Sequence, residues 1–94
     1  MKNYEVMYIC KVAYEEAIQS VADKFNTIIN NNGGNVEKTD VWGKKRLAYE
    51  IQDLVEGIYV LVTFAATPAC IQELDRLMRI DDAILRHMII SKGC

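Results

Sequence analysis

The side chains best placed to bind a ligand in this sequence are three consecutive cations: Lys44, Lys45 and Arg46. They follow the only tryptophan, Trp42, and a glycine that can bend or bulge a strand. From Leu47 to Ile51 apolar and polar residues alternate, which predicts a half-buried strand. This basic triplet (Lys44–Arg46) therefore lies at the start of the predicted strand. On its own such a triplet is typical of a solvated surface.

Other reactive groups are sparse. His87 is the sole histidine and lies in an apolar run with no other His or Cys nearby, which favours a structural or interface role over a catalytic base. Asp81 and Asp82 are typical of a turn between helix and strand, although two adjacent carboxylates could hold a cation. Gly33-Gly34 follows a helix, whereas a phosphate loop opens one. We therefore expect no enzymatic activity, no metal and no cofactor.

The three cysteines, Cys10, Cys70 and Cys94, are odd in number and widely spaced. This pattern favours reduced thiols over a disulfide framework or a zinc site. Cys10 and Cys70 are expected to be small core residues. No apolar run approaches the roughly 20 residues of a membrane helix, and the sequence starts without a signal-peptide pattern. The chain is therefore predicted to be cytoplasmic.

Length and charge narrow the class further. The 94 residues predict one domain, 1–94, with a single core. A net charge of −2 is mild evidence against a nucleic-acid binder, but the charges are segregated. Residues 15–24 carry three acids and one base, whereas 37–46 and 76–92 each carry four bases and two acids. Basic charge is thus concentrated in two segments of the chain.

The apolar spacing predicts four strands and two helices in the order β-α-β-β-α-β. The strands are expected at Asn3–Cys10, Val36–Ile51, Ile58–Ala65 and Ile84–Ser91, with a bend near Gly43 and a turn at Gln52–Gly57. The helices are expected at Tyr14–Ile29 and from Pro68 to Met78, the second with Thr67 as its N-cap. This order predicts an α+β, ferredoxin-like sandwich. Its four-stranded antiparallel sheet would carry both helices on one face.

The basic triplet belongs to the most distinctive segment of the chain, Trp42–Ile51, which resembles the signature of the bacterial small-ribosomal-subunit protein six family. Further segments agree in order along the chain: Tyr4-Glu5, Gly33-Gly34, Gly57–Val60 and Glu73–Arg86. The resemblance implies a structural constituent of the small ribosomal subunit without enzymatic activity. It also implies binding to the central domain of 16S rRNA as a heterodimer with ribosomal protein eighteen.

Carried onto this chain, the resemblance implies RNA contacts by cations along the sequence: Lys2, Lys44, Lys45, Arg46, Arg79, Arg86 and Lys92. The triplet and Arg86 would be the principal phosphate contacts. For Arg79 an ion pair with Asp75, one helical turn back, is an equally good interpretation. Trp42 and Tyr49 are expected to be packed rather than stacked on a base. The family also implies a place on the ribosome in the cytoplasm, with neither a membrane nor a small-molecule substrate as partner.

The chain departs from the family pattern at three places. Lys11-Val12-Ala13 stands where relatives usually carry a proline, and Gln52–Glu56 lacks their basic residues. The sequence ends at Cys94 without a long tail. Because the charge of the chain is modest, we expect weak RNA binding by the chain alone and dependence on its basic partner.

Two other functions fit the same fold. One is a single-strand RNA-binding module that uses Tyr4 and Tyr59 as stacking platforms on the open sheet, although the RNA-recognition motif is broken at Glu56 and Ile58. The other is a regulatory or ligand-sensing domain that dimerises through a sheet edge. Sequence alone does not assign the aromatic side chains to one face of the sheet.

Overall fold

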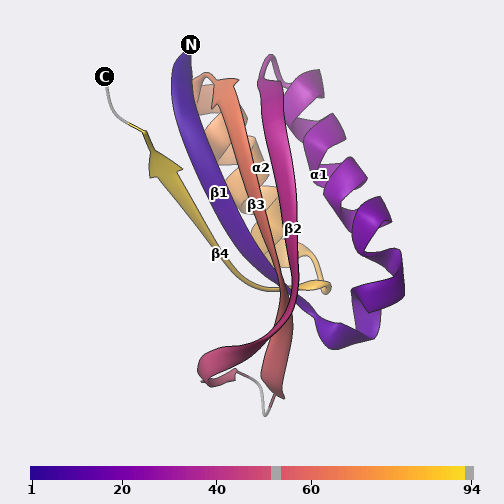
Figure 1. Ribbon diagram of the computed structural model, residues 1–94. Coiled ribbons are helices and arrows are strands. Elements are labelled where there is room, and N and C mark those ends of the chain that lie inside the picture. The colour runs from indigo at the N-terminus through magenta and orange to yellow at the C-terminus, as the bar shows by residue number, and fades with distance from the viewer. Residues whose placement is uncertain (52–53, 93–94) are drawn as a thin grey trace.

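The computed structural model describes residues 1–51 and 54–92, without the side chains of residues 48–51. Its elements are β1 (Lys2–Lys11), a 3-10 helix (Val12–Ala17), α1 (Ile18–Asn31), β2 (Asn35–Ile51), β3 (Leu54–Ala66), α2 (Pro68–Ile80) and β4 (Ile84–Ser91). In the described residues the strands form one sheet in the order β2-β3-β1-β4. Every neighbouring pair is antiparallel. Both α-helices cover one face of this sheet (Figure 1). The predicted ferredoxin-like sandwich is confirmed.

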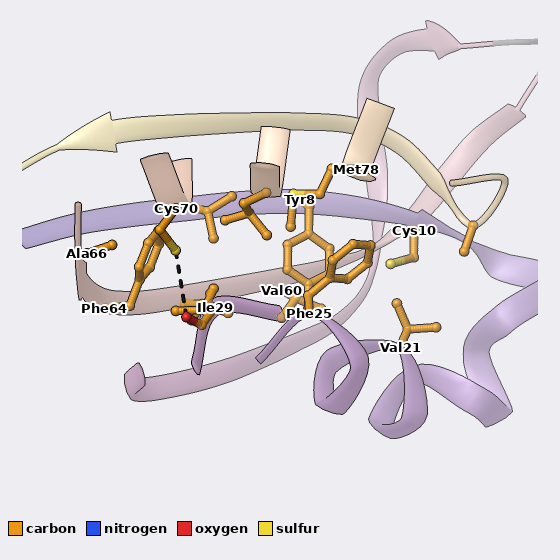
Figure 2. Close-up of a cluster of buried hydrophobic side chains, with 14 of the residues drawn as sticks. Tyr8, Cys10, Val21, Phe25, Ile29, Val60, Phe64, Ala66, Cys70 and Met78 are labelled. Carbon is orange, nitrogen blue, oxygen red and sulfur yellow. Dashed lines mark hydrogen bonds between the residues drawn. The ribbon is translucent and has the colours of Figure 1, made fainter. Parts of the chain in front are cut away.

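Alternation along the two central strands separates the two faces of the sheet. In β1, Val6, Tyr8 and Cys10 are fully buried, and in β3 the residues that pair with them or follow the same alternation are buried as well: Ile58, Val60, Val62 and Phe64. These side chains meet Phe25 and Ile29 of α1 and Cys70, Leu74 and Met78 of α2 (Figure 2). The intervening residues of β1 and β3 point to the face that no helix covers, which we call the open face.

The first helix differs from prediction mainly at its start, whereas the second begins at Pro68 as predicted. The first begins as a 3-10 turn at Val12, and regular α-helix starts at Ile18 instead of Tyr14. Neither Lys11 nor Ala17 offers a side-chain cap, so no hydrogen bond fixes an α-helical start. In α2 the expected cap is present, because Thr67 Oγ1 accepts a hydrogen bond from the Cys70 amide at 3.4 Å.

Two adjacent glycines end α1 for different reasons. Gly33 adopts φ +86°, where a β-carbon would be strained, and the Gly34 amide donates to the Ile29 carbonyl at 2.9 Å. Gly34 has an ordinary φ, but an added β-carbon would lie 2.6 Å from Ile29 Cγ2 and 2.9 Å from its carbonyl oxygen. The expected left-handed helix end is therefore found at Gly33 only. Gly34 is needed for close approach between α1 and the sheet.

The β2–β3 hairpin is longer than predicted. We expected a turn over Gln52–Gly57, but β3 begins at Leu54, and the pairs Arg46–Glu56 and Ile51–Leu54 extend the ladder. Residues 52 and 53 lie outside the described part. The consequence is a two-stranded arm, Gly43–Ile51 with Leu54–Gly57, that continues past the helices (Figure 1).

Candidate nucleic-acid interface

The basic triplet lies on the arm, in the edge strand of the sheet. Lys44 pairs with Ile58, Lys45 with Gly57 and Arg46 with Glu56, so backbone pairing to β3 fixes the position of all three residues. All three side chains are exposed. Because β2 has β3 as its sole neighbour in the sheet, one side of the strand that carries the triplet is open.

A β-bulge sets the direction of the chain as it enters the triplet. The register with β3 shifts between Val41 and Gly43, and Gly43 adopts φ +87°. Apart from its two chain neighbours, a β-carbon on Gly43 would meet no atom within 4 Å, so the glycine serves the backbone conformation and not a tight contact. The bend predicted at Gly43 is thus confirmed.

Trp42 does not pack as expected. Its side chain is 44% exposed, and the Lys45 ammonium lies over the indole, 4.8 Å from the ring centroid. Such a cation–π contact is worth about 0.5–1 kcal/mol at an exposed site. The prediction of a packed Trp42 is wrong: beside the register shift between Val41 and Gly43 the residue is exposed and lies outside the described core. The side chain of Tyr49 lies outside the described part.

The cations differ in whether a carboxylate lies beside them. Several are neutralised by neighbouring carboxylates: Lys24 by Asp81, Lys38 by Asp40, Arg76 by Glu73, Arg79 by Asp75 and Lys92 by Glu5. Among the residues and side chains that the structure describes, none of the triplet cations has an acidic partner. The triplet is therefore a local concentration of positive charge in a chain of net charge −2, with Glu56, the strand partner of Arg46, as the acidic residue opposite it.

Strand register brings two further cations to the same end of the sheet. Lys45 pairs with Gly57, which pairs with Lys11 in β1. Two residues further along the strands, Gly43, Tyr59, Ile9 and Arg86 follow one another across all four strands. At about 4.8 Å per strand, Arg86 lies roughly 14 Å from Gly43. Sequence reasoning predicted Arg86 and missed Lys11, which only the pairing of β1 with the arm brings close to the triplet.

Packing on the open face holds this row in place. A β-carbon on Gly57 would lie 2.4 Å from Ile9 Cγ2 and 3.4 Å from Leu47 Cδ2, so these side chains close over the glycine. Leu47 is buried there although it lies apart from the core beneath the helices. The contact ties the base of the arm to β1, so that the triplet and Lys11 are held by one packed unit.

The remaining predicted contacts lie elsewhere. Lys2 opens β1 and Lys92 follows β4, and the Lys92 amide donates to the Asn3 carbonyl, so both lie at the other end of the sheet. Nine residues of extended strand separate Lys2 from Lys11, about 30 Å. The structure therefore does not bring Lys2 and Lys92 together with the triplet.

Arg79 lies on α2 and takes part in a polar cluster with Asp75 and His87. One Asp75 oxygen pairs with Arg79, and the other lies 2.7 Å from His87 Nε2. The His87 side chain is 15% exposed. Asp75 thus links α2 to β4, in agreement with the ion pair considered for Arg79 and the structural role predicted for His87.

The other groups considered from the sequence are also placed. Asp81 accepts hydrogen bonds from Lys24 and from the Ala83 amide. Burial acts to raise the pKa of this carboxyl, but the two bonds and the Lys24 charge outweigh it and lower the pKa. The described residues hold no cluster of three potential metal ligands, and their helices include none that could span a bilayer.

Comparison with known proteins decides the family. The sequence model of the family "Ribosomal protein S6" matches residues 3–91. The chain belongs to this family. The S6 family consists of structural ribosomal proteins of the small subunit, so the chain is not an enzyme, and it is located on the ribosome in the cytoplasm. The resemblance recognised in the Trp42–Ile51 segment is confirmed.

Individual S6 proteins cover the whole chain. A small ribosomal subunit protein bS6 of Desulforamulus reducens is 53% identical over 99% of both chains. One from Clostridium acetobutylicum is 49% identical over 97% of both. The crystal structure of 30S ribosomal protein S6 from Thermotoga maritima is similar with a TM-score of 0.91 and 27% identity, covering 97% of this chain and 87% of that one. The S6 fold and sequence therefore extend over the described elements.

Proposed function

We propose that this S6-family chain binds the central domain of 16S rRNA together with ribosomal protein eighteen, and that the arm end of its sheet contacts the RNA. The observation that carries the proposal is the exposed basic triplet, which has no acidic partner among the described side chains. Lysine and arginine at such a site contact phosphates and fix position without reading bases. Lys11 in β1 and Arg86 in β4, two and three strands away from β2, extend the contact along the open face, which Lys45 shares by its pairing with Gly57.

Charge explains why the chain would need a partner. The cations outside this end are largely paired with carboxylates, and the chain as a whole is acidic. If about four phosphates are contacted, log affinity falls with log salt at a slope of only roughly −3 to −4. Such a contact orients the protein, and a basic partner would supply much of the affinity. Lys2, Arg79 and Lys92 remain predicted RNA contacts, secondary to the triplet and Arg86.

The open face offers a surface for the protein partner. Met88 and Ile90 of β4 are 53% and 47% exposed. Met88 lies on one row with Met7 and Leu61, which are half-buried. Apolar side chains grouped on an uncovered sheet are typical of a protein interface. This middle part of the open face adjoins the row of Arg86, so that one partner and the RNA could contact the chain side by side.

The two other functions considered from the sequence have less support. Tyr4 lies on the helix-covered face with its ring stacked on Phe64 at 6.0 Å, so it offers no platform to RNA, and only Tyr59 of that pair lies on the open face. A regulatory sheet-edge dimer loses its basis because the chain belongs to a family of ribosomal proteins.

Co-purification tests the proposal. The chain is isolated from its own cells at moderate salt beside two variants: the triplet changed to alanine (K44A/K45A/R46A) and the apolar surface changed by Met88→Glu. Recovery of small-subunit particles and protein eighteen with the unaltered chain is expected. The triplet variant should keep protein eighteen and lose particles, whereas Met88→Glu should lose protein eighteen.

Recovery of neither partner with the unaltered chain, and a homodimer in their place, would refute the proposal. Full recovery of particles with both variants would also contradict it. Thermal unfolding of each variant, expected to match the unaltered chain because all four side chains are exposed, serves as the folding control.

A further inference from the structure

Trp42 is an aromatic side chain that the fold does not use. The large apolar side chains exposed among the described residues are Met1, Val41, Trp42, Val55, Ile80, Met88 and Ile90. Trp42 is the one aromatic residue among them. The described core is built without it, and the bulge at Gly43 turns the chain beside it. Leaving an indole in water is unfavourable, so its exposure at the edge of the arm suggests a contact outside the chain.

The surroundings of Trp42 are those of a nucleobase platform. The Lys45 ammonium lies over the ring, 4.8 Å from its centroid, and the triplet begins two residues after Trp42. Aromatic rings beside cations bind single-stranded nucleic acid, because every base has a face that stacks and each base is joined to a phosphate. At 44% exposure the indole keeps surface that a base could cover, beyond its contact with Lys45.

We propose that Trp42 is a stacking platform for an unpaired base of the bound RNA, with Lys45 contacting the phosphate next to that base. The base has to be unpaired, because the bases of a continuous duplex are stacked on one another and turn only their edges to the protein. This inference rests on the proposed function, since it requires RNA at the triplet. It adds one contact that depends on a base and not on charge.

Salt dependence separates the two kinds of contact. Stacking releases no counterions, so Trp42→Leu should weaken binding by a similar factor at every salt concentration and leave the slope of log affinity against log salt unchanged. Base–aromatic stacking removed by truncation predicts a loss of roughly five- to one-hundred-fold. Lys45→Gln should instead reduce the slope by nearly one. Trp42→Phe keeps an aromatic face and should retain most of the affinity.

The experiment uses the full chain bound to protein eighteen and a central-domain RNA fragment, with affinity measured by filter binding at several salt concentrations. Trp42 is the only tryptophan of the chain, so its fluorescence reports on this site directly. Subtraction of the signal from the Trp42→Phe complex removes any contribution of the partner. Quenching on RNA addition is expected, and a fully paired hairpin of the same length should not cause it.

Each failure has its own signature. If Trp42→Leu binds RNA as tightly as the unaltered chain while the triplet variant does not, the stacking inference is overturned and the proposed function stands. If Trp42→Leu loses protein eighteen in the absence of RNA, Trp42 belongs to a protein interface and the inference is again overturned. If neither the unaltered chain nor its complex binds the fragment, the proposed function itself fails.

Discussion

Replacing the basic triplet by glutamine (K44Q/K45Q/R46Q) is expected to weaken the binding of the S6–protein eighteen complex to central-domain RNA in a salt-dependent way. Each phosphate contact contributes about 0.7–0.9 to the slope of log affinity against log salt. Loss of three contacts therefore lowers the slope by roughly 2 to 2.7. At about 0.1 M salt the same loss amounts to roughly 100-fold or more in affinity, or about 3 kcal/mol.

A matched control variant separates the effect of where the cations lie from the effect of the change in net charge. Lys24, Lys38 and Arg76 carry the same total charge as the triplet, but each is paired with a carboxylate, Lys38 Nζ at 3.5 Å from Asp40 and Arg76 Nε at 2.7 Å from Glu73. Their replacement by glutamine should change the slope by less than one. Filter binding between about 0.05 and 0.5 M salt resolves the difference, because the slope is linear in log salt over such a range. Equal effects of the two triple variants would refute a localised contact at the arm.

Two predictions concern stability. Gly33→Ala should cost about 1–2 kcal/mol because of its left-handed backbone, and Gly33→Asn should recover part of that cost, as asparagine tolerates this conformation. Gly34→Ala should cost about 1–3 kcal/mol through overpacking against Ile29, and Gly34→Asn should cost more. Urea unfolding measures the stability of all four variants. If asparagine restored stability at Gly34 as it does at Gly33, the different roles given to the two glycines would be contradicted. The second prediction concerns stability at alkaline pH. Burial, followed by the smaller effect of the Asp81 charge, raises the pKa of the Cys10 thiol to about 12 from an ordinary value of 9.0. The unfolded chain therefore releases this proton first, so stability falls as pH rises from about 9 to 12, by about 1.4 kcal/mol per pH unit for this one proton. Cys10→Ala should flatten the fall, and an unchanged slope would show that the thiol does not contribute.

The sequence predicted the fold well because its signals were local and periodic. The apolar strands around Val6 and Val60 and the helical stripe around Phe25 are properties of single elements, so these elements and the buried side of the helix were predicted correctly. The buried face of each strand was not assigned from the sequence. The Thr67 cap was also found, because it involves residues only three positions apart. What failed was the extent of the hairpin, since the pairing of Leu54 with Ile51 depends on a partner strand and not on propensity.

The site was predicted less completely, for a similar reason. The triplet could be found as a run of charges. Distant carboxylates decide which other cations are paired, however, such as Asp81, which lies 57 positions from Lys24. The proximity of Lys11 to the triplet depends on two successive strand pairings through Gly57. The exposure of Trp42 depends on the bulge at Gly43, and a glycine in a strand indicates a bulge without giving the direction of the side chain before it.

The most direct test of the account is to map RNA–protein crosslinks in small subunits assembled in the cell. Ultraviolet crosslinking followed by mass spectrometry identifies the peptides of this chain that touch RNA. The account predicts crosslinks in the segment that contains Trp42 and the basic triplet, with β1 near Lys11 and β4 near Arg86 as further sites. Crosslinks confined to the helix-covered side, such as the exposed surface of α1, would contradict it.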